Sequence, residues 1–235
     1  MWYGIYEYAF AHSEKISFFI TNTDAQSNLL RKQLKKYQGV EPDIRTIPVT
    51  GLDRLRKPER NRRKHSLISA GRLAPEKRMN QAIEAVVMAR KEVPDVSLDI
   101  YGEGAEKEGL QQLIDQLGCG AYVHLCGFQK LDEKYQEYEA YLSASYVETL
   151  GVTLLEAIGS GLPVVSYDMR YGAQMFIDEG QNGYKVPWEN VNELAKGIVR
   201  LFTEADMEVF QKHSYEKAET YLTKEVEEKW KNLLC

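Results

Sequence analysis

From residue 66 onward, short runs rich in β-branched residues alternate with amphipathic stretches of helical spacing. The stretches at 77–91 and 106–117, for example, repeat apolar residues every three or four positions, which predicts helices. Further helices are expected at 132–140, 152–158 and 190–202. The runs between such stretches are strand-sized, and six are expected to be strands: residues 66–70, 96–101, 122–125, 141–144, 163–167 and 184–186. This alternation predicts an α/β fold with a Rossmann-like parallel sheet covered by helices on both faces.

Residues 1–50 are organised differently. They predict a strand at 18–22, a helix at 24–37 and a strand at 44–49, a single β–α–β piece too small to bury a core of its own. We therefore divide the 235 residues into four regions: a β–α–β remnant of another domain (1–50), a basic linker (51–65), the main ligand-binding domain (66–203) and C-terminal helices (204–235).

Charge and composition exclude several classes of protein. The net charge of -5 argues against a general binder of nucleic acids or other polyanions. Three cysteines in no zinc-binding pattern favour a reduced, cytoplasmic compartment, and the four scattered histidines predict no metal site. No apolar run approaches the length of a membrane-spanning helix, and the first residues lack the pattern of a signal peptide.

A strongly basic segment, residues 54–65, lies between the two units. Its cations could contact an anionic acceptor or the surface of a membrane. Because charge runs are usually exposed loops, we favour a solvated linker.

Ligands bind beyond the carboxyl ends of parallel strands, so the loops after the expected strands are the first places to look for chemistry. Gly71 and Arg72 follow the first of these strands, and Lys77 comes five residues after the arginine. A planar guanidinium and a compact ammonium group together suit a diphosphate. An ion pair at the start of a helix explains the two cations equally well.

The next strand is followed by Gly102 and Gly104. A dinucleotide-binding loop needs a third glycine in register, and Gly109 is out of that pattern. We expect a tight turn that also lets a ligand approach the backbone.

Two glutamates, Glu148 and Glu156, stand eight positions apart around an expected helix start. Eight helical residues span about 12 Å, whereas glycosidases place their two carboxyls about 5 Å apart or, when inverting, less than about 10 Å apart. The pair therefore suits two contacts with one elongated ligand better than hydrolysis. Glu148 would contact a sugar, backbone N–H groups near 150–153 would hold phosphate, and Glu156 would reach a ribose.

The surroundings of Glu156 strengthen this interpretation. Its helix is largely apolar, and a buried carboxylate without a function or a partner is costly. Further along, Gly159 and Gly161 are expected to end the helix. The loop at 167–172 could face the ligand or an acceptor, or simply hold an Asp–Arg pair.

Taken together, these motifs resemble the C-terminal half of glycosyltransferase family 4, whose members are retaining enzymes of the GT-B fold. The resemblance covers about residues 66–203, and residues 1–50 resemble the last β–α–β portion of that family's N-terminal domain. Residues 170–174 are most similar to a bacterial subgroup, the adhesin-modifying N-acetylglucosaminyltransferases and the poly(glycerol phosphate) α-glucosyltransferases. The motifs that carry the family resemblance are Gly71-Arg72…Lys77, Gly102-x-Gly104, Gly127, Glu148-x7-Glu156, Gly161-Leu-Pro-Val and Gly180-Gln-Asn-Gly183.

The resemblance implies a role for each candidate residue. Arg72 and Lys77 would bind the diphosphate of a UDP-sugar and stabilise the departing nucleotide, and Glu148 would contact the transferred sugar. Glu156 would hold the ribose, and the loop of Phe128 and Gln129 would flank the uracil. The implied donor-binding residues are Gly71, Gly102, Gly104, Gly127, Phe128, Gln129, Thr149, Leu150, Gly151, Val152 and Glu156; no metal or other cofactor is implied.

The implied activity is the transfer of a hexose or N-acetylhexosamine from a UDP-sugar to a hydroxyl group of a protein or of a polyol-phosphate polymer of the cell wall. The reaction would take place in the cytoplasm. A contact of the enzyme with the inner membrane face, or with a partner subunit, is compatible with the sequence. Because most of an acceptor-binding N-terminal domain is missing, we expect weak donor binding and poor transfer by this chain alone. Two alternatives are a non-catalytic partner subunit that binds nucleotide-sugar and a GT-B UDP-sugar epimerase.

Overall fold

The computed structural model describes residues 4–35, 43–57 and 61–234. A parallel six-stranded sheet forms the centre of its larger unit, with the strand order β10-β8-β6-β3-β4-β5. The strands are β3 (Ser66–Ala70), β4 (Ser97–Tyr101), β5 (Val123–Gly127), β6 (Ala140–Ser143), β8 (Val164–Tyr167) and β10 (Gly183–Val186). The predicted α/β fold with a parallel sheet is confirmed.

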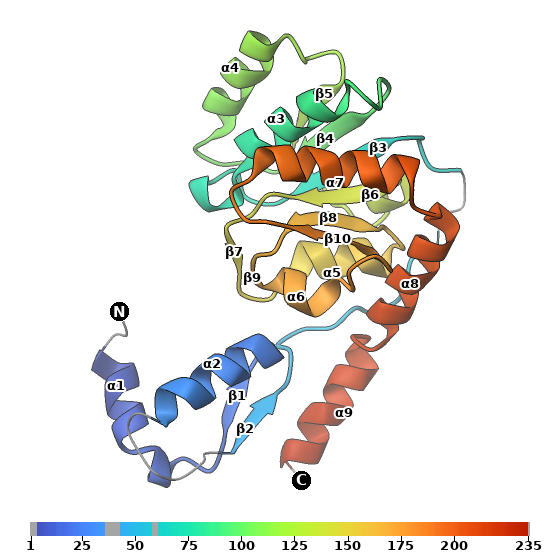
Figure 1. The fold of residues 1–235 in the computed structure, drawn as a ribbon. Helices are drawn as coiled ribbons and strands as arrows, with labels where there is room; N and C mark the ends of the chain where they lie inside the picture. Colours follow the sequence, from blue (N-terminus) through green and yellow to red (C-terminus); the bar gives the residue numbers. More distant parts are fainter. Residues whose placement is uncertain (1–3, 36–42, 58–60, 235) are drawn as a thin grey trace.

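Helices cover both faces of this sheet (Figure 1). One layer holds α3 (Met79–Ala89), α4 (Lys107–Leu117) and α7 (Val191–Thr203); the other holds α5 (Val152–Gly159) and α6 (Gly172–Phe176), with α8 (Met207–Glu219) packed on α5. Neighbouring residues of β3 serve opposite layers, Leu67 the first and Ile68 the second, as the two-residue period of a strand requires. No helix in the described ranges is long and apolar enough to span a bilayer.

Several short elements lie outside the predicted pattern. The helix expected at 132–140 is only a 3₁₀ turn, η3 (Lys134–Glu137), because β6 begins at Ala140. Two further 3₁₀ turns are η1 (Ser13–Lys15) and η2 (Pro75–Lys77). The two-residue strands β7 (Val147–Glu148) and β9 (Arg170–Tyr171) pair in parallel, with Glu148 opposite Tyr171.

The smaller unit contains α1 (Gly4–Ala11) and the expected β–α–β order: β1 (Phe19–Thr21), α2 (Asp24–Leu34) and β2 (Ile44–Thr46). β1 and β2 are parallel neighbours. Thr23 and Gln26 form a capping box at the start of α2, which satisfies two backbone N–H groups. The end of the helix expected up to Tyr37 lies outside the described residues.

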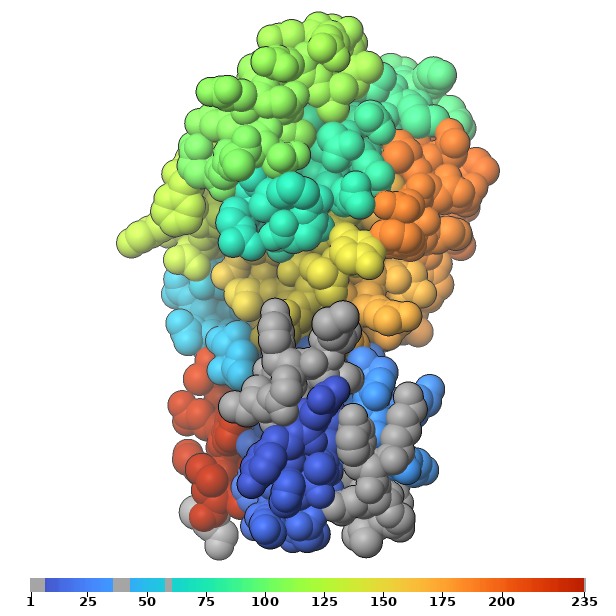
Figure 2. Space-filling view, turned by 90° about the vertical axis from the view of Figure 1, so that its left-hand side faces the viewer, coloured from blue at the N-terminus to red at the C-terminus, as the bar shows by residue number. Residues whose placement is uncertain are grey.

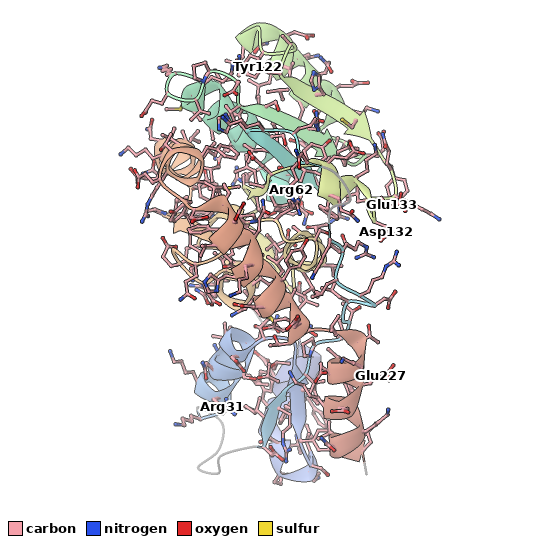
Figure 3. The ribbon with its side chains drawn as sticks, turned by 90° about the vertical axis from the view of Figure 1, so that its right-hand side faces the viewer. Arg31, Arg62, Tyr122, Asp132, Glu133 and Glu227 are labelled. Atoms are coloured by element: carbon pink, nitrogen blue, oxygen red, sulfur yellow. The ribbon has the colours of Figure 1, made fainter. Side chains whose placement is uncertain are left out.

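The chain passes between the two units twice, at neighbouring points. Leu52 donates its N–H to Tyr221 O at 2.8 Å, and Thr223 donates to Leu52 O at 2.8 Å. Beyond this point α9 (Thr223–Leu234) leaves the large unit and lies along the small one (Figures 1 and 3). There Trp230 Nε1 donates to Pro48 O at 3.3 Å, so the last helix belongs to the small unit's packing.

The basic segment at 54–65 is not simply the solvated linker that the sequence favours. Arg62 points into the large unit (Figure 3), where its guanidinium donates to Tyr135 O at 3.2 Å, Tyr138 O at 2.6 Å and Ser160 O at 2.5 Å. Carbonyls at the end of a helical turn keep lone pairs that the turn does not use, so a buried guanidinium can bond to them. Tyr135 O also accepts the N–H of Tyr138 at 3.3 Å, and Ser160 O accepts the Tyr215 hydroxyl at 3.1 Å. Burial lowers the pKa of Arg62, and desolvation is the main cause.

Two other arginines of this segment also contact the large unit. Arg63 Nη2 lies 2.8 Å from Asp99 Oδ2, and Arg56 Nη2 lies 2.8 Å from Asp132 Oδ1. Among the described cations of the segment, Arg54, Lys57 and Lys64 are exposed as expected. Counting charges in the sequence cannot separate these two groups, because the carbonyl partners of the segment are distant in sequence.

Candidate functional site

A cleft of about 740 Å³ opens where β3, β4 and β5 end. Figure 2 faces this edge of the sheet, with the small unit below. The loops after the three strands and two residues of α5 line the cleft: Ala70, Gly71, Arg72, Tyr101, Gly102, Glu103, Phe128, Gln129, Lys130, Leu131, Asp132, Thr153 and Glu156. Six predicted site residues are among them: Gly71, Arg72, Gly102, Phe128, Gln129 and Glu156.

The glycines of the first two loops hold the loops together. A Cβ atom on Gly102 would lie 1.8 Å from Gly71 O, and one on Gly104 would lie 2.2 Å from Leu73 O. Both distances are below any contact that real atoms make. Gly104 thus serves the close approach of two backbones outside the cleft lining, although the sequence predicted it as a ligand-binding residue.

Gly127 stands behind the cleft wall as well. Its carbonyl accepts the N–H of Gly102 at 2.9 Å, which joins the second loop to the third. A Cβ atom there would lie 3.1 Å from Glu103 Oε1, a side chain that does line the cleft. Its place in the structure is therefore that of a support for the lining residues.

Lys77 and Glu148 come from two different loops and meet beside the cleft. Lys77 Nζ lies 2.5 Å from Glu148 Oε1, and Ser145 Oγ donates to the same oxygen at 2.9 Å. The side chains keep only 15% and 14% of their surface exposed. The Lys77 chain passes over Gly71, where a Cβ atom would lie 3.4 Å from the Lys77 Cε, so the ammonium group stands next to the cleft lining.

Arg72 has a looser setting. Its side chain is 72% exposed and its Nη2 lies 2.6 Å from Glu76 Oε1, four residues on. This is the ion pair that the sequence left open as an alternative. An exposed pair of this kind contributes little stability, so Arg72 can exchange Glu76 for an anionic ligand in the cleft.

Glu156 is held at the other side of the cleft. Tyr135 donates its hydroxyl to Glu156 Oε2 at 3.0 Å. Burial raises the pKa of Glu156, and the hydrogen bond from Tyr135 and the nearby charge of Arg56 oppose that rise. An ionised carboxylate has about four acceptor positions, so one bond from Tyr135 leaves room for ligand hydroxyls.

The segment between the two glutamates forms the start of α5. Gly151 adopts a left-handed conformation (φ 82°) at the N-cap, and no side chain caps the helix. Val152 is 46% exposed, Leu150 is buried, and Thr149 O accepts a bond from Gln26 of the small unit at 3.0 Å. The four predicted residues 149–152 thus lie outside the cleft lining and leave N–H groups open at a helix start beside Glu148.

Sequence reasoning missed several residues of this site. Arg56, Asp132 and Tyr135 surround Glu156 but come from the supposed linker and from a stretch predicted as a regular helix. Tyr141 in β6 donates its hydroxyl to Ala70 O at 3.0 Å, and its oxygen lies 2.9 Å from Thr153 Oγ1, which joins two walls of the cleft. A tyrosine inside an apolar strand was the one available signal, since a buried hydroxyl needs a partner.

Residue types that bind metals are scattered in the described part of the chain. Within residues 4–35, 43–57 and 61–234, no group of three His, Cys, Asp or Glu side chains is placed to hold a metal ion. Cys119 and Cys126 are both free thiols. The cationic groups beside the cleft include those of Arg72, Lys77 and Lys130.

Comparison with known proteins points the same way as this geometry. The family described as Glycosyl transferases group 1 matches residues 53–219. The GtfA subunit of UDP-N-acetylglucosamine–peptide N-acetylglucosaminyltransferase from Limosilactobacillus reuteri subsp. suis is 45% identical over 241 residues, covering 100% of this chain and 47% of that protein. The chain thus spans about half the length of such relatives.

Two further proteins extend the comparison. The crystal structure of the pneumococcal O-GlcNAc transferase GtfA in complex with UDP and GlcNAc superposes with a TM-score of 0.90 at 41% identity, covering 99% of this chain and 47% of that one. The poly(glycerol-phosphate) alpha-glucosyltransferase of Bacillus subtilis is 31% identical over 169 residues, which are 71% of this chain and 25% of that protein.

Proposed function

Because this chain belongs to the family Glycosyl transferases group 1, we propose that it is the donor-binding half of a retaining glycosyltransferase. The enzyme would move a hexose or an N-acetylhexosamine from a UDP-sugar to a hydroxyl group of its acceptor. The family resemblance and the GT-B type of fold expected from the sequence motifs are confirmed.

One observation carries the proposal: charged groups from four separate elements converge on one cleft. Lys77 and Glu148 meet on one side, Arg72 lines the rim, and Glu156 stands on the far wall. Two cations together with one carboxylate on each side of the cleft match a ligand with an anionic centre and hydroxyl groups at both ends. A nucleotide-sugar has that arrangement.

The residues would then act as follows. The donor's diphosphate replaces Glu148 as the partner of Lys77 and replaces Glu76 as the partner of Arg72. The two cations then stabilise the charge that develops on the departing UDP. Glu148, released from Lys77, accepts hydrogen bonds from hydroxyls of the transferred sugar. The acceptor hydroxyl attacks the anomeric carbon on the face from which UDP leaves, and its proton passes to the departing phosphate oxygen, so the configuration is retained. Because the cations supply the positive charge, the proposal calls for no metal ion.

The nucleoside end of the donor is assigned in the same way. Glu156 accepts hydrogen bonds from the ribose hydroxyls, and Phe128 and Gln129, which line the cleft after β5, flank the uracil. Phe128 is 81% exposed, so a planar base can cover its ring. Gly71 and Gly102 leave room for the phosphates beside the backbone.

The names of the relatives narrow the choice of donor and acceptor for the proposed reaction. GtfA was crystallised with UDP and GlcNAc, and the Limosilactobacillus protein is named as a subunit that acts on peptides. We extend this to the present chain as a UDP-N-acetylhexosamine donor, a protein acceptor and a second subunit. A polyol-phosphate polymer, which the Bacillus relative's name indicates, is the alternative acceptor. The proposed location is the cytoplasm, at or near the inner membrane face, in keeping with the free thiols.

A purely non-catalytic partner subunit is the less favoured alternative. Such a protein has no need of the catalytic charges, yet Arg72, Lys77, Glu148 and Glu156 are all present and in position. No observation favours an epimerase over a transferase.

Calorimetric titration of the chain with UDP, UMP and 2′,3′-dideoxy-UDP tests these assignments. Lys77→Met should weaken the binding of UDP by about 10- to 100-fold, because one charged hydrogen bond is lost. The binding of UMP should change much less, because UMP lacks the second phosphate. Glu156→Gln should weaken UDP and UMP alike and leave the dideoxy compound unchanged. Lys196→Met, an exposed change on α7, is the matched control. No UDP binding by folded wild-type chain at about 1 mM would contradict the proposal.

The pH dependence gives a second readout for Glu156. Its pKa in the folded chain is raised above 4.5 by burial, so its contribution to stability is present below 4.5 and is lost as the pH rises through the folded-state pKa. Glu156→Gln should therefore gain stability relative to wild type as the pH rises through this window. UDP affinity of the wild type should fall as the pH drops through it, whereas the variant should show no such step.

A further inference from the structure

Two exposed aromatic rings lie beside the Lys77–Glu148 pair and have no part in the proposed function. Tyr146 and Trp188 are 50% and 43% exposed, with ring centroids 4.9 Å apart and planes tilted by 50°. Tyr146 is in the loop after β6 and Trp188 in the loop after β10, two loops that adjoin in Figure 2, yellow beside orange. Large apolar groups gathered in solvent commonly mark a binding site.

The loop that carries Tyr146 is held in place by its backbone. Tyr146 N–H donates to Glu76 O at 2.8 Å, which fixes its loop to the turn that carries Lys77. Tyr146 is also two residues from Glu148, whose strand β7 pairs with β9. The aromatic pair therefore has a fixed position next to the reacting end of the donor, outside the lining of the nucleotide cleft.

A charged pair flanks the rings. Arg78 Nη2 lies 3.2 Å from Glu189 Oε1, and the two side chains are 39% and 42% exposed. Glu189 directly follows Trp188, and Arg78 directly follows Lys77. Both residues have positive φ angles, 50° for Arg78 and 53° for Glu189, which is uncommon for residues other than glycine and is concentrated at functional sites.

We propose that Tyr146 and Trp188 bind a pyranose ring that the acceptor already carries, with Arg78 and Glu189 as hydrogen-bonding partners of its hydroxyls. A pyranose presents a face of C–H groups, which packs on the electron-rich face of an aromatic ring, and a rim of hydroxyls, which suits a guanidinium and a carboxylate. This inference rests on the proposed function, because it names the substrate at the acceptor end of the same site.

The size of the patch favours a sugar over a folded partner. Two half-exposed aromatic side chains offer on the order of 200 Å², whereas a stable protein interface needs about 800 Å² from each side. A single six-membered ring matches the smaller area. The inference has a functional consequence: acceptors with a sugar near the target hydroxyl should be held better than unglycosylated acceptors.

The test is saturation-transfer NMR of the chain with methyl α-N-acetylglucosaminide, with UDP titrated in a separate arm. Wild type should bind the glycoside at millimolar concentration. Trp188→Ala and Tyr146→Ala should each weaken that binding by at least about fivefold, whereas Trp188→Phe, which keeps an aromatic ring, should retain most of it. Tyr8→Ala, an exposed aromatic change on α1, is the control. UDP affinity should stay within about twofold of wild type in all four variants.

Glu148→Gln separates this site from the donor-sugar position. A glycoside on the aromatic pair is unaffected by that change, whereas one in the donor-sugar position is weakened by it. The inference is overturned if wild type shows no transfer at about 10 mM glycoside, if Trp188→Ala binds like wild type, or if Glu148→Gln alone weakens binding. Failure of the proposed function would appear separately, as loss of UDP binding by the wild type.

Discussion

The large unit encloses two apolar layers around six strands, whereas the apolar cluster in the described part of the small unit buries Phe10, Leu34 and Ile44 beside two three-residue strands. Small units bury a smaller fraction of their surface and are correspondingly marginal. The stability of the small unit therefore depends on contacts with the C-terminal helix α9, above all on the hydrogen bond from Trp230 to Pro48 O. The donor cleft, by contrast, is supported within the large unit.

This difference separates two tasks. Every residue that lines the donor cleft belongs to the large unit or to its loops. From the small unit, a bond from Gln26 to Thr149 O reaches the start of α5, next to Glu148. We therefore expect the proposed donor binding to depend on the large unit, and to change little when the position of the small unit changes.

The largest expected effect tests whether the large unit is as closely packed as this comparison requires. In Gly102→Ala the new Cβ would meet Gly71 O at 1.8 Å, so the two loops must separate. We expect a loss of more than about 3 kcal/mol in the free energy of unfolding and no UDP binding. Gly109→Ala, whose Cβ meets nothing on α4, should instead gain about 0.5–1 kcal/mol. Equal effects in chemical denaturation would break the comparison.

A second change tests whether the basic segment belongs to the large unit. Arg62→Ala removes three buried hydrogen bonds from a charged donor and should lower the free energy of unfolding by about 2–3 kcal/mol. Arg54→Ala removes an exposed charge and should change it by less than about 0.5 kcal/mol. If the two variants unfold at the same denaturant concentration, the segment is a solvated linker after all.

The smallest expected effect is local to the small unit. Trp230→Ala should weaken the packing of α9 and cost about 1–2 kcal/mol in that unit alone. Amide hydrogen exchange should quicken in β1, α2 and β2 while β3 and β4 stay protected, and UDP affinity should not change. Trp188→Ala serves as the control tryptophan change. Faster exchange throughout the sheet would show that the two units unfold together.

The large unit could be predicted from the sequence because its signals are local and repeated. The expected bounds of strand β3 match the observed ones, and those of α5, α7 and β10 agree within a residue or two. Glycine or proline stands next to β3, α5 and β10, and the asparagine that begins α7 is a common N-cap residue. Two-residue strands such as β7 and β9 carry no period. The stretch at 132–140 misled because Tyr135 and Tyr138 have helical spacing but are buried by a 3₁₀ turn.

The candidate site divides in the same way. Lys77, Arg72 and the two glutamates could be selected because unusual residue types stand at strand ends and a helix start. Their pairing could not be predicted, since Lys77 and Glu148 are 71 residues apart in the chain. Arg56 and Arg62 were hidden for a related reason: a charge run shows cations, and only the fold shows which of them meet a carboxylate or a carbonyl group.

The chain crosses between the two units at Leu52 and again at Leu222, and these two crossings determine where chimeras with related chains can be joined. The family match ends at residue 219, before α9, which packs on the small unit. A donor half exchanged with that of a relative at one breakpoint near residue 51 would bring a foreign α9 to the small unit. A functional chimera therefore needs two junctions, one on each side of the 52–222 contact, so that the last helix stays with the unit whose surface it matches.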